Sequence, residues 1–187
     1  MKGAQTIRKY TVLWLIWVAG LASIPFSLQA QSREYLLKAG FVEKFTQFVQ
    51  WPGRQQLADT LFRIAVVGEN RFGSSLDELF REVKVNRQGV IISYLPRFQE
   101  SNNLRMLFIS GSVSSEEADQ IFLFAEGKPI LTIAETKGFG KKGAIINLLV
   151  VDNFIRYEIN LSALEKSGLK MSSLLINSAT LIETDDK

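Results

Sequence analysis

FRIAVVG, at residues 62–68, is the most informative segment of the chain for the fold. It is a short, nearly continuous apolar run rich in β-branched residues, which is typical of a strand covered on both faces. Apolar residues at helical spacing over 76–83 then predict an amphipathic helix, and VIISYL at 90–95 predicts a second strand. A strand, a helix and a strand at this short spacing predict a parallel pair joined by a crossover.

The same alternation continues toward the C-terminus. RMLFIS at 105–110 predicts a third strand, residues 115–125 predict a third helix, and 129–134 predict a fourth strand. The first turns of that helix carry acidic side chains where the helix dipole favours them, Glu116, Glu117 and Asp119. Strands that alternate with helices place the domain in the α/β class, with a mostly parallel sheet.

The C-terminal part departs from this alternation. Residues 144–151 and 154–161 flank Asp152-Asn153, two residue types that tolerate left-handed backbone angles, and this predicts an antiparallel hairpin at the edge of the sheet. Ser162 and Glu165 have the spacing of a capping box, so we expect them to open a last helical segment. We expect this segment to break at Gly168 and to resume over 171–176.

Upstream of the first strand, residues 33–49 predict a helix that ends at Trp51-Pro52-Gly53. Its apolar face is expected to contain Leu37, Phe41, Val42, Phe45, Phe48 and Val49. Lys38, Glu43, Lys44 and Gln47 are expected to face mostly away. The aromatic stripe has two interpretations, a cap on the sheet or the wall of an apolar ligand pocket, and the cap is the commoner role of such a stripe.

Residues 1–30 have the order of a secretory signal peptide. An apolar run without charge, residues 11–26, follows a basic start formed by Lys2, Arg8 and Lys9. A polar stretch of small residues then ends at Ala30, so we predict cleavage there and a single mature domain over 31–187. The alternative is an uncleaved anchor, although the run is shorter than the roughly 20 apolar residues that span a bilayer.

Charge and composition exclude several classes of function. The chain has 22 Lys and Arg against 19 Asp and Glu, and three of those bases lie in the predicted signal peptide, so the mature part is neutral. A neutral surface gives no electrostatic reason to expect a nucleic acid or an anionic membrane as partner. The sequence contains no His and no Cys, which excludes imidazole-based triads, thiolate nucleophiles and zinc sites of the usual kind. We therefore expect no enzyme, no cofactor and no metal.

Two glycine-containing segments are candidates for binding sites. Residues 68–75 follow a strand and open a helix, as a phosphate loop does, but they lack the Lys that phosphates require and contain Glu69, so we interpret them as a strand-to-helix turn. Residues 137–143 hold three Lys and three Gly. A flexible solvated loop has the same composition, although Phe139, Lys141 and Lys142 are the residues we predict to contact a partner.

Several segments, in order along the chain, resemble the YfiR family of periplasmic proteins. They are KAGFVEKFTQFVQWP at 38–52, IAVVG at 64–68, FG at 72–73, GAIIN at 143–147, INL at 159–161 and GLKMSSLL at 168–175. The resemblance runs from about residue 34 to 182 and so covers the whole predicted mature domain. It implies a Rossmann-like three-layer α/β sandwich that is often dimeric.

The resemblance also implies a function. The best-known member of the family represses an inner-membrane diguanylate cyclase by binding its periplasmic sensing region, which controls cyclic di-GMP and biofilm formation. We therefore expect a periplasmic regulator whose partner is the sensor region of a cyclase or of a sensor kinase. That member uses disulfides to respond to redox conditions, and this chain has no Cys, so redox sensing does not carry over. The alternative hypothesis is a periplasmic small-molecule-binding protein with a crevice at the strand ends.

Overall fold

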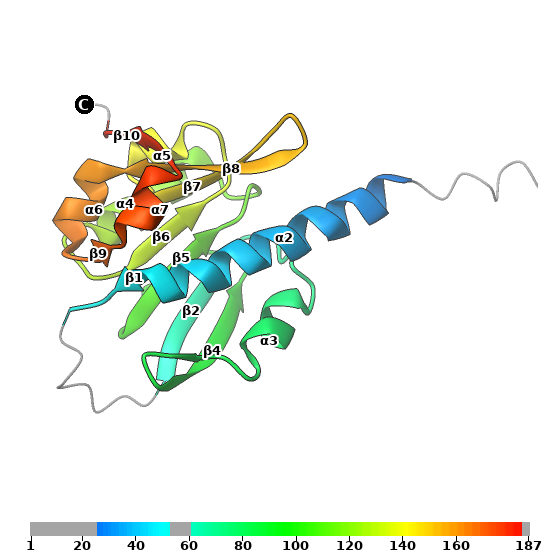
Figure 1. Ribbon diagram of the computed structural model, residues 1–187, viewed down its shortest axis with the longest axis horizontal. Helices are drawn as coiled ribbons and strands as arrows, with labels where there is room; N and C mark the ends of the chain where they lie inside the picture. Colours follow the sequence, from blue (N-terminus) through cyan, green and yellow to red (C-terminus); the bar gives the residue numbers. More distant parts are fainter. Residues whose placement is uncertain (1–25, 53–60, 185–187) are drawn as a thin grey trace, which may run out of the picture. The chain divides into compact units, whose positions relative to one another are not determined.

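The computed structural model describes residues 26–52 and 61–184 (Figure 1). Backbone contacts divide the chain into two units, residues 1–33 and residues 34–187, and the second is described below. Most of the predicted signal peptide, 1–30, lies outside the described residues, and its last five residues belong to helix α2 (Phe26–Phe48). Among the described helices, none is long and apolar enough to cross a membrane.

An eight-stranded sheet forms the centre of the second unit, in the order β10-β8-β7-β6-β5-β2-β4-β3. Its neighbouring strands β4, β2, β5, β6 and β7 run parallel, and only β3, β8 and β10 run the other way. The bounds are β2 Leu61–Val67, β3 Lys84–Val85, β4 Gln88–Leu95, β5 Leu104–Ile109, β6 Leu131–Ala134, β7 Ile146–Val151, β8 Phe154–Asn160 and β10 Thr180–Ile182. The predicted parallel pair of the first two long strands, β2 and β4, is confirmed.

Helices cover both faces of the sheet. They are α2 together with α3 Ser75–Phe80, α4 Ser115–Ala125, α5 Phe139–Lys142, α6 Leu161–Ser167 and α7 Ser173–Asn177. Buried side chains of α2, α3 and α7 belong to one hydrophobic core, and those of α4 and α5 belong to a second core on the other face. This arrangement confirms the expected α/β sandwich of three layers.

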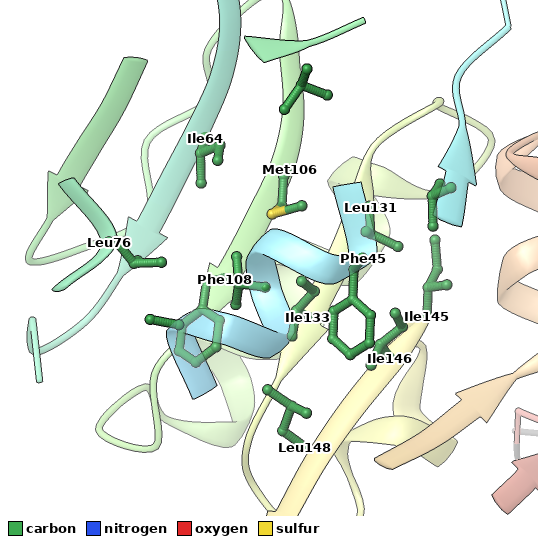
Figure 2. Packing of buried hydrophobic residues seen from close by; sticks show 14 of the residues in the cluster. Phe45, Ile64, Leu76, Met106, Phe108, Leu131, Ile133, Ile145, Ile146 and Leu148 are labelled. Carbon is green, nitrogen blue, oxygen red and sulfur yellow. The ribbon is translucent and has the colours of Figure 1, made fainter. Parts of the chain in front are cut away.

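The larger core lies between α2 and the central strands. Phe45 of α2 is fully buried, and its ring lies beside Ile133 of β6 and Ile146 of β7 (Figure 2). Burying a side chain of this size contributes about 1.5–3 kcal/mol. A second, two-stranded antiparallel sheet, β1 Val49–Gln50 with β9 Lys170–Met171, ties the end of α2 to the segment between α6 and α7. The sequence did not predict this small sheet.

The buried face of α2 differs from the predicted one. Leu37 is 58% exposed, whereas Lys38 is only 4% exposed. Val42, Phe45 and Val49 are buried as predicted. Glu43, which was expected to face away, is only 9% exposed. The predictions for Leu37, Lys38 and Glu43 are therefore wrong. For Lys38, an acidic partner on the sheet makes burial of the lysine favourable.

Two predictions for the C-terminal part need correction. The hairpin of β7 and β8 has the expected turn, with Asp152 at φ 50° and Asn153 at φ 63°, but β10 pairs beside β8, so the hairpin is not the edge of the sheet. The predicted capping box at Ser162 is wrong as well. Asn160 caps α6, because its Oδ1 accepts a hydrogen bond from the N–H of Ala163 at 2.9 Å.

Candidate functional site

The carboxyl edge of the parallel strands is the place where α/β domains of this kind bind ligands. The crevice opens where the strand order reverses, since the loops after the two adjacent strands leave in opposite directions. Here the reversal lies between β2 and β5, because β4 continues the sheet on one side of β2 and β6 continues it on the other. The segments that leave this point begin at Gly68 and at Ser110.

A polar cluster lies beside this point, at the carboxyl ends of β5 and β6. We call it the buried polar cluster, and it is formed by Glu34, Tyr35, Lys38, Gly111 and Glu135. Glu135 directly follows β6, and its side chain is 3% exposed. Its Oε2 lies 2.6 Å from Lys38 Nζ, and its Oε1 accepts hydrogen bonds from the Tyr35 hydroxyl and the Gly111 N–H, both at 2.7 Å. Glu34 lies 2.5 Å from the same Nζ. Helix α2 is thus held to the ends of β5 and β6 through one fully paired carboxylate.

Tyr35 joins this cluster to the hydrophobic core. Burial, followed by the hydrogen bond to Glu135, raises the pKa of the Tyr35 hydroxyl above its ordinary range. Its ring packs edge-on against Phe72 at 5.2 Å between centroids, and Phe72 packs on Phe108 of β5 at 4.7 Å. Side chains of the protein itself therefore fill the position that a ligand takes in related architectures.

Residues 68–75 form the strand-to-helix turn that the sequence predicted. Gly68 has φ +95°, and a Cβ there would lie 2.6 Å from Ser112 Oγ, so the position needs glycine for two reasons. Asn70 closes the turn, since its Oδ1 accepts from the Phe72 N–H at 3.0 Å. Glu69 pairs with Arg71 at 2.8 Å, which leaves this turn without a basic group directed at a phosphate.

The segment 137–143 is ordered by a short helix, α5. Phe139 is 5% exposed and packs on Phe122 of α4 with the ring centroids 6.0 Å apart. The prediction that Phe139 contacts a partner assumed an exposed loop, and that assumption is wrong because the ring completes the core under α4. Lys142 Nζ lies 3.0 Å from Asp119 of α4 and Lys141 is exposed. A partner role for Phe139, Lys141 and Lys142 stays a prediction.

A cavity of about 450 Å³ lies between α4, α5 and α6. Phe122, Ile130 and Ile145 form part of its apolar wall. Two ion pairs at its rim join α4 to the neighbouring helices, Asp119 with Lys142 at 3.0 Å and Glu126 with Lys166 at 2.8 Å. Its volume is within the range of pockets that hold small molecules.

The aromatic stripe of α2 acts mainly as a cap on the sheet. Phe45 is fully buried, and its ring centroid lies 5.5 Å from that of Tyr157 on β8. The groove beside it, between α2 and α7, measures about 190 Å³. This is below the usual volume of a small-molecule pocket, so the geometry favours the interpretation of the stripe as a cap.

Two buried asparagines explain the segments GAIIN and INL. Asn160 Nδ2 donates to the Gly140 carbonyl of α5 at 2.7 Å and to Thr184 Oγ1 at 2.9 Å. Asn147 Nδ2 donates across the hairpin to Glu158 at 3.0 Å. Both side chains are fully buried. They fix α5 and the C-terminal segment to the hairpin, a structural role that the sequence alone did not reveal, because isolated Asn residues on strands have no pattern.

Among residues 26–52 and 61–184, no group of three acidic, His or Cys side chains gathers in a way that could hold a metal ion. The fold and this edge of the sheet define a class: a doubly wound α/β domain whose own helix closes the usual ligand crevice. The YfiR/HmsC-like family model matches residues 35–180, and the chain belongs to this family of periplasmic regulators of cyclic di-GMP signalling. A search of curated proteins finds no match.

Proposed function

We propose that this protein is a periplasmic regulator that binds and represses the periplasmic sensor region of an inner-membrane signalling enzyme. The first candidate for that enzyme is a diguanylate cyclase, and the second is a sensor kinase. Export would use residues 1–30 as a cleavable signal peptide, and a homodimer would fit the family. The observation that carries the proposal is the closed crevice, in which Lys38, Tyr35 and Glu135 satisfy one another.

Binding without catalysis is part of the proposal. The sequence contains no His or Cys, and most general bases in enzymes are His. Glu135 is the buried carboxylate at the strand ends, where an α/β enzyme would place its chemistry. It already has three polar partners among the described residues, Lys38, Tyr35 and the Gly111 N–H. A group held in this way is suited to fixing a helix and leaves little capacity to bind or activate a substrate.

Deletion of the gene tests the cyclase version. We expect cellular cyclic di-GMP and biofilm to rise in the deletion strain and to return to the original level when the exported chain is supplied again. A chain lacking residues 1–30 supplies the control, since it would stay in the cytoplasm and leave both readouts high. Unchanged cyclic di-GMP and biofilm in the deletion strain would rule out the cyclase version.

A second candidate function, small-molecule binding, is favoured by the cavity between α4, α5 and α6. A ligand that binds only the folded state raises the midpoint of thermal unfolding. We therefore propose a thermal-shift screen of metabolites against the chain and against Ala163→Trp, which would fill part of that cavity. A shift seen in the original chain and lost in the variant would support this second function.

A further inference from the structure

Strand β8 is paired along only half of its outer side. On its inner side β7 pairs with every residue from Phe154 to Ile159. On its outer side β10 pairs only with Glu158, Ile159 and Asn160. Among the residues that the structure describes, no strand lies against the remainder. Figure 1 shows the hairpin extending past the short β10. We call Phe154–Tyr157 the open edge.

The register shows which backbone groups the open edge presents. The Asn160 N–H donates to the Ile145 carbonyl on the β7 side, so the N–H and C=O of the next residue, Ile159, point outward to β10. Backbone direction alternates along a strand, and those of Tyr157 and Ile155 therefore point outward as well. Because the parallel pairing of Thr180 with Glu158 uses the Tyr157 carbonyl, the unpaired groups are the Tyr157 N–H and both groups of Ile155. Each unpaired N–H and C=O on a sheet edge is a template for another strand. The open edge thus offers a place where one further strand can extend the sheet.

The side chains beside the open edge are suited to contact with another protein. Phe154 is 65% exposed and Val151, its cross-strand neighbour, is 47% exposed. Ile155 is half-buried on the opposite face of the strand, the face that packs toward α2. Charged side chains, proline and bulges are the usual devices that protect an edge from pairing. Residues 154–157 contain no proline, and Arg156 is their one charged side chain. Their regular pairing with β7 shows no bulge either.

Arg156 gives the open edge its charge preference. It is exposed, its guanidinium lies 5.9 Å from the centre of the Phe154 ring, and it has no carboxylate partner among the described residues. In an antiparallel addition Arg156 would occupy a non-hydrogen-bonded position, where side chains across the two strands approach most closely. An acidic residue opposite Arg156 would be stabilising. A second copy paired about Arg156 would instead bring two guanidinium groups together.

We propose that the open edge binds an extended segment of a partner protein, added antiparallel to β8 with the pattern apolar, acidic, apolar. The apolar residues lie opposite Tyr157 and Ile155, and the acidic residue lies opposite Arg156. The inference rests on the proposed function, since it names the surface through which this regulator would hold its partner.

The test uses defined peptides and the protein purified after export. The probe is acetyl-Thr-Val-Glu-Val-Thr-amide, and the matched control has Lys in place of Glu. Backbone amide signals are followed by NMR as each peptide is added. We expect the Ile155 and Tyr157 signals to shift, with the Glu peptide binding about fivefold tighter than the Lys peptide. We expect Arg156→Glu to reverse this preference.

Ile155→Pro removes the outward N–H, which an edge strand tolerates, and should abolish binding, whereas Ile155→Val should keep it. The proposal fails if saturating peptide leaves both signals unchanged or if Ile155→Pro binds as well as Ile155→Val. Self-association that Ile155→Pro abolishes, without a peptide effect, would also overturn it in favour of a second copy. Cyclic di-GMP and biofilm could rise in the deletion strain and return fully to the original level when the Ile155→Pro variant is supplied. That result would refute binding through the open edge and would leave the proposed function intact.

Discussion

The buried polar cluster and the open edge differ in both burial and hydrogen bonding. In the cluster, Lys38 and Glu135 have side chains 5% and 3% exposed, and each polar group has a partner inside the domain. At the open edge, Phe154 is 65% exposed, and the outer side of Ile155 has no strand beside it among the described residues.

This contrast indicates which of the two regions is able to bind a partner. A buried charge is costly unless it is paired, so the cluster stabilises only the closed position of α2. An unpaired sheet edge gains hydrogen bonds when a strand is added, and exposed apolar side chains gain by burial. The cluster at the strand ends thus has a structural role in holding α2, and the open edge is the surface that we propose for recognition.

The largest effect should come from breaking the cluster. Lys38→Met leaves Glu135 buried without its cation, and removal of one partner of a buried pair costs about 3–5 kcal/mol. Denaturant unfolding of the exported chain measures this loss. Lys44→Met is the matched control, because Lys44 is exposed on the same helix, and it should change the free energy of unfolding by less than about 0.5 kcal/mol. Equal effects of the two substitutions would show that the cluster does not hold α2.

A smaller effect is expected at the base of the hairpin. Asn160→Ala removes the cap of α6 and the hydrogen bond to Gly140, and loss of a cap with a buried partner costs about 2 kcal/mol. Ser162→Ala, at the residue that the sequence wrongly predicted to be part of the cap, serves as the control and should change stability by under about 0.5 kcal/mol. A larger cost at Ser162 than at Asn160 would contradict the assigned cap.

Alkaline pH should lower the free energy of unfolding, in part through Tyr35 of the cluster. Burial raises the pKa of Tyr35, and burial with a hydrogen bond to Asp77 raises that of Tyr94. A group whose pKa is raised by folding stabilises the folded state fully below its unfolded pKa, near 10 for Tyr, and loses that contribution as pH rises toward the folded pKa. Stability should hold from pH 7 to 9 and fall above about 10.

Tyr35→Phe separates the contribution of the cluster from that of Tyr94. The variant lacks the hydrogen bond to Glu135, so its free energy of unfolding at pH 7 should be about 1 kcal/mol lower. Above pH 10 its free energy of unfolding should fall less steeply than that of the original chain. Unfolding curves at each pH measure both quantities. An unchanged alkaline slope would mean that Tyr35 does not titrate with unfolding.

The smallest effect on stability should come from the open edge. Phe154→Ser replaces an exposed ring that packs on no buried residue, so the free energy of unfolding should change by less than about 0.5 kcal/mol. Binding of the Glu peptide should nevertheless weaken, because the exposed ring contributes apolar area on the added strand's side. A loss of stability comparable to that of Lys38→Met would place Phe154 in the folded core and remove the contrast.

The sequence predicted the elements whose own pattern is strong. The helix 115–125 was predicted with its observed bounds and with acidic residues in its first turns, and the structure adds its cap, Ser114. Strand β2 was found from its apolar run. The two-residue strands β1 and β9 and the three-residue β10 were missed, since strands this short have no readable period.

The candidate site was harder to predict than the fold. Lys38 looked like a surface residue, because its burial depends on Glu135, 97 residues away. Phe139 looked exposed among Lys and Gly, although tertiary packing on Phe122 buries it. Both errors come from contacts between distant segments, which a local pattern does not contain.

Site-specific photo-crosslinking in the periplasm tests the central claim most directly. A photoreactive amino acid at position 154 tests the open edge. A second one, at position 69, tests the surface near the buried polar cluster, because the Glu69 side chain is 61% exposed there. We predict that position 154 crosslinks to an inner-membrane protein with a periplasmic sensor region and a cyclase or kinase domain, and that position 69 does not. A crosslink to that protein from position 69 alone would contradict the account.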